Sequence, residues 1–205
     1  MALRLERLLV SAGDTAVGIV RNADHVGDVQ AAGAEARLCD LEATDLDAVA
    51  AHLEEADAVV FAAGAGPGSG IPRKQTVDRD ASVLMADAAE RAGVRRFVQI
   101  SSMGAGAPPR PGTDETFAAY LRAKTEAEED LRRRDLDWTV LRLGGLTNPP
   151  RTGRARLAPS VPPGQINRDD VAAVIVGLLS HARGIGQTLE LVAGDTPIDQ
   201  ALEQL

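Results

Sequence analysis

Cysteine, aromatic residues and lysine are all scarce in this chain of 205 residues. The single cysteine, Cys39, excludes an internal disulfide and a multi-cysteine metal site, and no metal centre is predicted. Phe, Trp and Tyr together make up 2% of the residues, so the core must be packed mainly with aliphatic side chains. No apolar run reaches the length of a membrane span, and the charged first residues are not typical of a signal peptide. We therefore expect a cytoplasmic protein without a membrane partner.

Positive charge is in deficit as well. The formal net charge is -8 and the calculated pI is about 4.9. Proteins that bind nucleic acids usually carry a basic patch that neutralises phosphates, so no nucleic-acid partner is expected. The length suits one domain with a substantial core.

Short apolar runs alternate along the chain with amphipathic segments. Strands are predicted at 16–20, 35–38, 57–63, 96–100, 137–143 and 188–192, and helices at 26–32, 45–53, 72–91, 168–179 and around Tyr120 as far as about 133. The apolar runs do not alternate with polar residues, which indicates strands covered on both faces. The pattern predicts an α/β fold with a doubly wound, mostly parallel sheet. In such sheets ligands bind beyond the carboxyl ends of the strands.

The most informative pattern is Tyr120 four residues before Lys124, on a predicted helix that follows a strand ending in Ser101 and Ser102. Residues four apart lie on the same helix face, so the phenol and the ammonium point into the same space. A Tyr-x-x-x-Lys pair with an upstream serine resembles the short-chain dehydrogenases/reductases. The chain is most similar to their atypical branch, which comprises single-domain NAD(P)-binding, epimerase-like proteins. The resemblance implies one Rossmann-like domain over 1–205, with a short substrate-side loop region at about 144–168.

The resemblance also implies a set of catalytic roles. Ser101 or Ser102 holds the substrate oxygen, Tyr120 transfers a proton, and Lys124 lowers the pKa of the phenol. Asp78 occupies the position at which extended relatives carry a catalytic-site asparagine. The residues alone leave two alternatives open. One is that Tyr120 is an ordinary half-buried tyrosine and Lys124 a surface lysine, and the other is that Asp78 is an exposed acid on a helix.

Cofactor contacts are implied at strand ends. Arg21 beside Asn22 favours NADP over NAD, because a cation suits the additional phosphate, although a solvated arginine remains an alternative. The other positions that the resemblance assigns to the cofactor are Asp40 and Leu41 at the adenine, Ala62, Ala63 and Gly64 at the ribose, and Gly144 and Thr147 at the nicotinamide end. Asp40 has the equal alternative of a turn or cap residue.

One expected motif is missing. Dinucleotide folds begin with a strand and a Gly-x-Gly-x-x-Gly turn at a helix N-terminus, whereas this chain begins with a predicted helix that ends at Gly13. The glycines of 64–70 do not fit the motif, and Pro67 removes an amide donor, so we interpret 64–70 as a flexible loop. We expect Met1 to be an internal methionine of a longer protein, which makes the predicted fold N-terminally incomplete.

Three functions are compatible with these features. The first is an NADP-dependent oxidoreductase or epimerase-like enzyme for a small carbonyl, quinone or flavin-type substrate. The second is a regulatory protein that senses NAD(P) without turnover, and the third is a truncated form with impaired cofactor binding. A homodimer through the helices that carry Asp78 and Tyr120 is one option, because these helices pair in many members of the family that the chain resembles.

Overall fold

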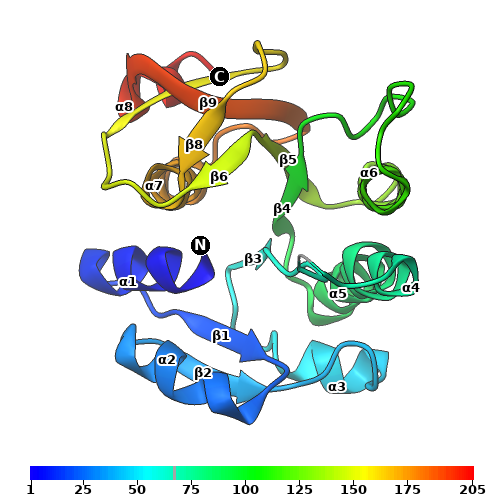
Figure 1. The fold of residues 1–205 in the computed structure, drawn as a ribbon. Coiled ribbons are helices and arrows are strands. Elements are labelled where there is room, and N and C mark those ends of the chain that lie inside the picture. The colour runs from blue at the N-terminus through cyan, green and yellow to red at the C-terminus, as the bar shows by residue number, and fades with distance from the viewer. Residues whose placement is uncertain (67) are drawn as a thin grey trace. The chain divides into compact units, whose positions relative to one another are not determined.

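The computed structural model describes residues 1–66 and 68–205, and the predicted loop residue Pro67 lies outside them. The chain forms two compact units (Figure 1). The first unit comprises Met1–Asp40, Leu143–Gly184 and Leu189–Leu205, and the second comprises Leu41–Arg142 and Ile185–Thr188. Within the described residues, no helix combines the length and the apolar character needed to cross a membrane.

The first unit begins with helix α1 (Ala2–Ala12), which ends at Gly13 in the left-handed conformation with a φ of 93°, as predicted. Strands β1 (Val17–Val20) and β2 (Glu35–Leu38) form a parallel pair, connected by the short helix η1 (Ala23–His25) and by α2 (Val26–Ala31). A small aliphatic core of Ala16, Val29 and Ala34 joins these elements.

The remainder of the first unit contains more strands than predicted. β6 (Gly145–Thr147) pairs with β8 (Gln165–Asn167), and β7 (Arg154–Ala158) pairs antiparallel with β9 (Gln187–Pro197). Helices α7 (Arg168–Ser180) and α8 (Ile198–Glu203) complete the unit. The substrate-side loop region predicted at about 144–168 thus contains the short strands β6, β7 and β8. The short alternation in β7, with Ala155 and Leu157 buried and Arg154 and Arg156 exposed, forms a strand because β9 supplies its hydrogen bonds.

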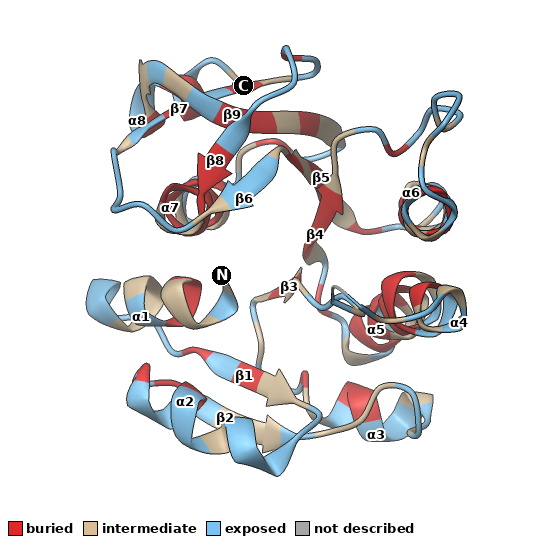
Figure 2. Ribbon diagram, in the orientation of Figure 1, coloured by how far each residue is buried: buried red, intermediate tan, exposed pale blue. Residues whose placement is uncertain are grey.

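The second unit contains the strands β3 (Ala58–Phe61), β4 (Arg96–Ser102) and β5 (Asp137–Leu143) in the order β3-β4-β5, with β3 and β4 parallel. Its main helices are α3 (Leu46–Ala51), α5 (Ala81–Ala92) and α6 (Glu115–Leu131). Figure 2 shows β4 buried over most of its length. These parallel strands and intervening helices confirm the predicted α/β architecture.

The long helix predicted at 72–91 is interrupted by a wide turn. α4 (Ile71–Arg73) leads into η2 (Lys74–Asp80), which has π-helical hydrogen bonding, and then into α5, which ends at Gly93 as predicted. The buried residues of η2 are Lys74, Val77 and Asp78. Such π-helical turns are rare and are found often at functional sites.

Candidate active site

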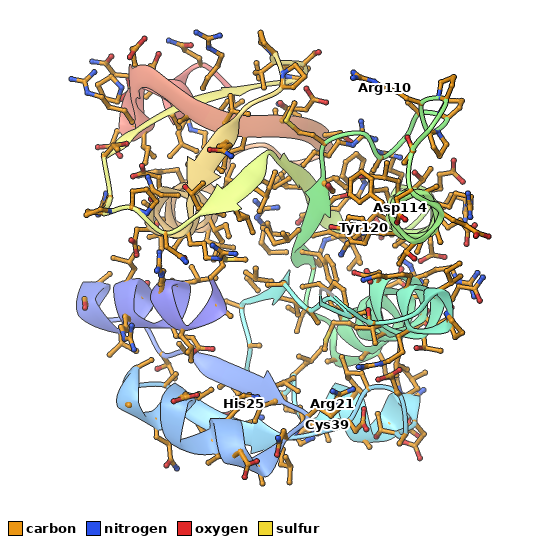
Figure 3. All side chains as sticks on the ribbon, viewed as in Figure 1. Arg21, His25, Cys39, Arg110, Asp114 and Tyr120 are labelled. Atoms are coloured by element: carbon orange, nitrogen blue, oxygen red, sulfur yellow. The ribbon has the colours of Figure 1, made fainter. Side chains whose placement is uncertain are left out.

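Tyr120 lies on α6, which Asp114 caps by accepting a hydrogen bond of 2.9 Å from the backbone N–H of Phe117. Figure 3 shows Tyr120 on the side of this helix that faces β4, whereas Arg110 lies on the preceding loop, away from the phenol. The phenol lies near Ser102 at the end of β4, whose hydroxyl donates a hydrogen bond of 3.3 Å to the Met103 carbonyl. Burial raises the pKa of Tyr120, and the negative charge of Asp78 raises it further, whereas the interaction with Ser102 lowers it. The phenol is therefore protonated at neutral pH.

Lys124 lies one helical turn after Tyr120, and only 3% of its surface is exposed. Its Nζ lies 3.3 Å from Asp78 Oδ1 and donates a hydrogen bond of 3.2 Å to the Ile100 carbonyl. The same Nζ lies 5.9 Å from the centroid of the Tyr120 ring. Burial lowers the pKa of Lys124, whereas Asp78 acts in the opposite direction. Lys124 and Asp78 are both buried, so the alternatives of a surface lysine at Lys124 and of an exposed acid at Asp78 are wrong.

The two predicted serines have different partners. Successive residues of a strand point to opposite faces of the sheet. Ser102 lies near Tyr120 and influences its pKa, whereas the Ser101 hydroxyl donates to Glu128 Oε1 at 2.5 Å. Glu128 also accepts hydrogen bonds from Arg132 and Arg142. Ser102 is therefore the serine that the structure brings to the phenol, and Ser101 belongs to a buried ion-pair network.

Two residues beside Tyr120 were not predicted from the sequence. The Phe117 ring stacks on the Tyr120 ring with a centroid distance of 5.8 Å. Lys74 Nζ lies 5.5 Å from the centroid of the Tyr120 ring and donates a hydrogen bond of 2.8 Å to the Gly66 carbonyl. A signal existed for both, because Phe117 precedes Tyr120 by three residues and Lys74 precedes Asp78 by four.

The loop after β3 carries the predicted ribose-contacting residues of the second unit. Ala62 is half-buried, and Ala63 and Gly64 are exposed. A Cβ at Gly64 would lie 3.1 Å from Asp78 Oδ1, and the backbone N–H of Ala65 donates to Asp78 Oδ2 at 3.3 Å. Asp78 thus accepts a hydrogen bond from the backbone of this loop and also forms the ion pair with Lys124. Leu41, predicted at the adenine, is half-buried in the same unit.

The other predicted cofactor residues belong to the first unit. Arg21 follows β1 directly and is exposed, at the same end of the two-stranded sheet as Cys39 after β2 (Figure 3). Asn22 caps η1 by accepting the backbone N–H of Asp24 at 3.0 Å. Asp40 is half-buried.

Gly144 and Thr147, predicted at the nicotinamide end, also lie in the first unit. A Cβ at Gly144 would approach the Gly164 carbonyl and the Val192 side chain too closely, so protein packing requires a glycine there. Thr147 ends β6, and its carbonyl accepts a hydrogen bond of 3.2 Å from Arg168. Neither observation calls for a ligand.

The residues around Tyr120 fit the reacting end of a nicotinamide cofactor, because they combine a protonated phenol, a hydroxyl partner, a buried lysine and small residues at a strand end. The sequence contains no Gly-x-Gly-x-x-Gly turn for the pyrophosphate. Among the residues that the structure describes, no group of three His, Cys, Asp or Glu side chains is arranged to hold a metal ion.

A family model described as NAD(P)H-binding matches residues 1–182. The chain belongs to this NAD(P)H-binding family. It is 35% identical over 187 residues to an uncharacterized sugar epimerase of Bacillus subtilis, YhfK, which covers 91% of this chain and 86% of that protein. A solved structure from Bacillus halodurans, assigned by name to the NAD-dependent epimerases/dehydratases, is 35% identical with a TM-score of 0.90. The match covers 100% of this chain and 94% of that one.

A third relative is ChuY of Escherichia coli, described as an anaerobillin reductase. It is 26% identical with a TM-score of 0.77, and the match covers 94% of this chain and 91% of that one. Together these findings confirm the predicted atypical short-chain dehydrogenase/reductase type and the Rossmann-like fold.

Proposed function

We propose that this chain is an NADP-dependent oxidoreductase or epimerase-like enzyme for a small carbonyl, quinone or flavin-type substrate. Of these activities, we propose reduction of the substrate. The observation that carries the proposal is the state of Tyr120. Burial raises the pKa of the phenol, so it is protonated at neutral pH, near Ser102 and with its ring centroid 5.9 Å from Lys124 Nζ. A protonated phenol suits the reduction of a carbonyl, which consumes a proton at oxygen. The reductase activity named for ChuY supports the same direction.

The cofactor, when bound, supplies the hydride. The Ser102 hydroxyl donates a hydrogen bond to the substrate oxygen and orients it toward Tyr120. Tyr120 donates its proton to that oxygen as negative charge develops there. The Lys124 ammonium stabilises the phenolate that remains, and Asp78 keeps Lys124 in position through their ion pair. Asp78 thus acts on Lys124 and on the loop after β3, and does not itself transfer the proton.

The choice of NADP rests on Arg21. This exposed guanidinium follows β1, at the position where the family reads the adenosine ribose, and it suits a phosphate there. Arg21→Ala should raise the Kd for NADPH about tenfold and leave that for NADH within about twofold. Equal changes for the two cofactors would contradict a phosphate contact.

Tyr120→Phe tests the mechanism. Removal of the phenolic proton should lower NADPH-dependent turnover about a hundredfold to ten-thousandfold, because general acid catalysis contributes this much. The affinity for NADPH, followed by its fluorescence, should stay within about twofold. Unchanged turnover would remove Tyr120 from the mechanism. NADPH binding without turnover of any substrate in a panel would support the sensor, and absence of binding would support the truncated form.

A further inference from the structure

Lys74, the other of the two lysines, is buried and has no acidic partner among the residues that the structure describes. Only 7% of its surface is exposed, and its Nζ donates one hydrogen bond, to the Gly66 carbonyl. An ammonium has three N–H donors, and among the described residues the Gly66 carbonyl is the one acceptor recorded for them. Among the described residues, no carboxylate oxygen lies within 4.0 Å of this Nζ, whereas Lys124 has Asp78 at 3.3 Å.

The charges around Tyr120 therefore do not balance. Two ammonium groups, of Lys74 and Lys124, lie within 6 Å of the ring centroid. Among the described residues, Asp78 is the one carboxylate within 4.0 Å of either nitrogen, and it pairs with Lys124. The unbalanced charge belongs to a side chain that is withdrawn from water. A buried cation without a counter-charge costs several kcal/mol, so an anion that enters beside Lys74 would gain a large electrostatic interaction.

An exposed aromatic surface lies next to this cation. The Phe117 side chain stacks on Tyr120, and Phe117 remains 47% exposed. The whole chain has five aromatic residues, so two stacked rings at the catalytic position are a concentrated feature. Such a surface favours a planar, conjugated ligand that stacks on the rings.

Given the proposed reductase function, we infer that Lys74 is a specificity-determining residue that receives an acid group of the substrate. The substrate class is a planar, conjugated carbonyl compound that carries a carboxylate or a phosphate. A phosphate of the cofactor has the same chemistry. Lys74 lies against the ring of the proton-donating tyrosine, at the reacting end of the site, so we assign the acid group to the substrate.

The test compares para-formylbenzoate with its methyl ester, which differ in charge and share the aromatic aldehyde. With NADPH, the unaltered protein should reduce the acid with a kcat/KM about tenfold or more above that of the ester, the range expected for a charge-assisted hydrogen bond. Lys74→Met should abolish this preference and Lys74→Arg should keep part of it. Arg122→Met, which removes a cation from an exposed position of α6, should leave the preference unchanged.

A binding measurement separates this inference from the reductase proposal. Calorimetry with para-formylbenzoate should show binding to the unaltered protein and loss of at least about tenfold in affinity for Lys74→Met, whether or not the aldehyde is reduced. Thermal unfolding checks that each variant is folded. Reduction of neither aldehyde would count against the reductase and would not affect this readout.

Three results would overturn the assignment of Lys74. One is the absence of any preference for the acid in the binding of the unaltered protein. The second is the same preference in Lys74→Met. The third is a weaker affinity for NADPH in Lys74→Met with the acid preference retained, which would assign Lys74 to a cofactor phosphate.

Discussion

The two units bury acidic side chains in opposite ways. In the second unit, Glu128 is 0% exposed and is held by Ser101 and by the guanidinium groups of Arg132 and Arg142. In the first unit, Glu6 is 9% exposed, and its Oε2 has no hydrogen-bond partner in the described part of the chain. The comparison teaches that a carboxylate is buried with two compensating cations on the helix that also carries Tyr120 and Lys124, whereas the first unit buries a carboxylate oxygen without such a partner among the described residues.

Asp170 lies between these extremes. It is buried in the first unit, and its carboxylate accepts hydrogen bonds from the uncharged donors of Thr152, Gly153 and Asn167. Three buried carboxylates therefore form a series, from two cations at Glu128 through neutral donors at Asp170 to an unpaired oxygen at Glu6. Substitutions of these three residues should therefore change the free energy of unfolding by different amounts, and the change for Glu6 should have the opposite sign.

The largest effect is expected for Glu128→Ala. It leaves two guanidinium groups without their shared carboxylate, and breaking a buried ion pair in this way costs about 3–5 kcal/mol. Urea unfolding followed by circular dichroism measures the loss. Glu129→Ala, at the neighbouring exposed position of α6, should change the stability by less than about 0.5 kcal/mol. Equal losses for the two variants would contradict a special role of the buried network.

Asp170→Ala should cost about 2–3 kcal/mol, since it leaves the part-buried donors of Thr152 and Gly153 and the buried amide of Asn167 without their charged acceptor. Asp169→Ala is the matched control, because Asp169 makes a partly exposed ion pair with Arg4 that contributes about 1 kcal/mol or less. A loss for Asp170→Ala no greater than that of the control would show that the donors find other acceptors.

The same residue predicts a pH dependence. Burial by itself raises the pKa of Asp170, but the hydrogen bonds from Thr152, Asn167 and Gly153 lower it below the ordinary 3.8. The folded state therefore binds this proton less readily than the unfolded state. The stability that Asp170 contributes is present above pH 3.8 and is lost as the pH falls through the lowered pKa. Acid unfolding of the unaltered protein and of Asp170→Ala should thus converge at low pH.

Asp78→Asn extends the comparison of buried carboxylates to the active site, where Asp78 affects the pKa of Tyr120. Asp78 contributes to the raised pKa of Tyr120, so its neutralisation should lower the midpoint of the phenol titration. Tyr120 is the only tyrosine, and the ultraviolet absorbance of tyrosinate therefore reports this group alone. The unaltered protein should titrate above 10.0. Asp80→Asn, at an exposed position of the same turn, should leave the midpoint unchanged. A higher midpoint in Asp78→Asn would refute the assigned electrostatic role.

The smallest effect, with reversed sign, is expected for Glu6→Gln. Burial raises the pKa of Glu6, so Glu6 favours folding below its ordinary pKa of 4.5 and loses that contribution as the pH rises through the raised pKa. At neutral pH a neutral glutamine should stabilise the protein by about 1 kcal/mol, and this gain should vanish below pH 4. Thermal unfolding at both pH values, with the exposed Glu203→Gln as control, measures it. Destabilisation at neutral pH would mean that Glu6 has a partner in solution.

The sequence alone determined many of the elements and the family. Local periodicity placed β2 and β5 at their observed bounds, and glycines in the left-handed conformation ended α1 and α5. The spacing of Tyr120 and Lys124 on one helix face was readable for the same reason, because the helical repeat is a local property.

Only the tertiary structure decided which side chains of the site lie against one another. Ser101 and Ser102 are equivalent in the sequence, and the distant Glu128 distinguishes them. Lys74 reaches Tyr120 across 46 positions of the chain because η2 packs against α6. Likewise β7 exists as a strand because β9 supplies its partners. Such contacts depend on burial and on pairing between distant segments, which a local pattern does not encode.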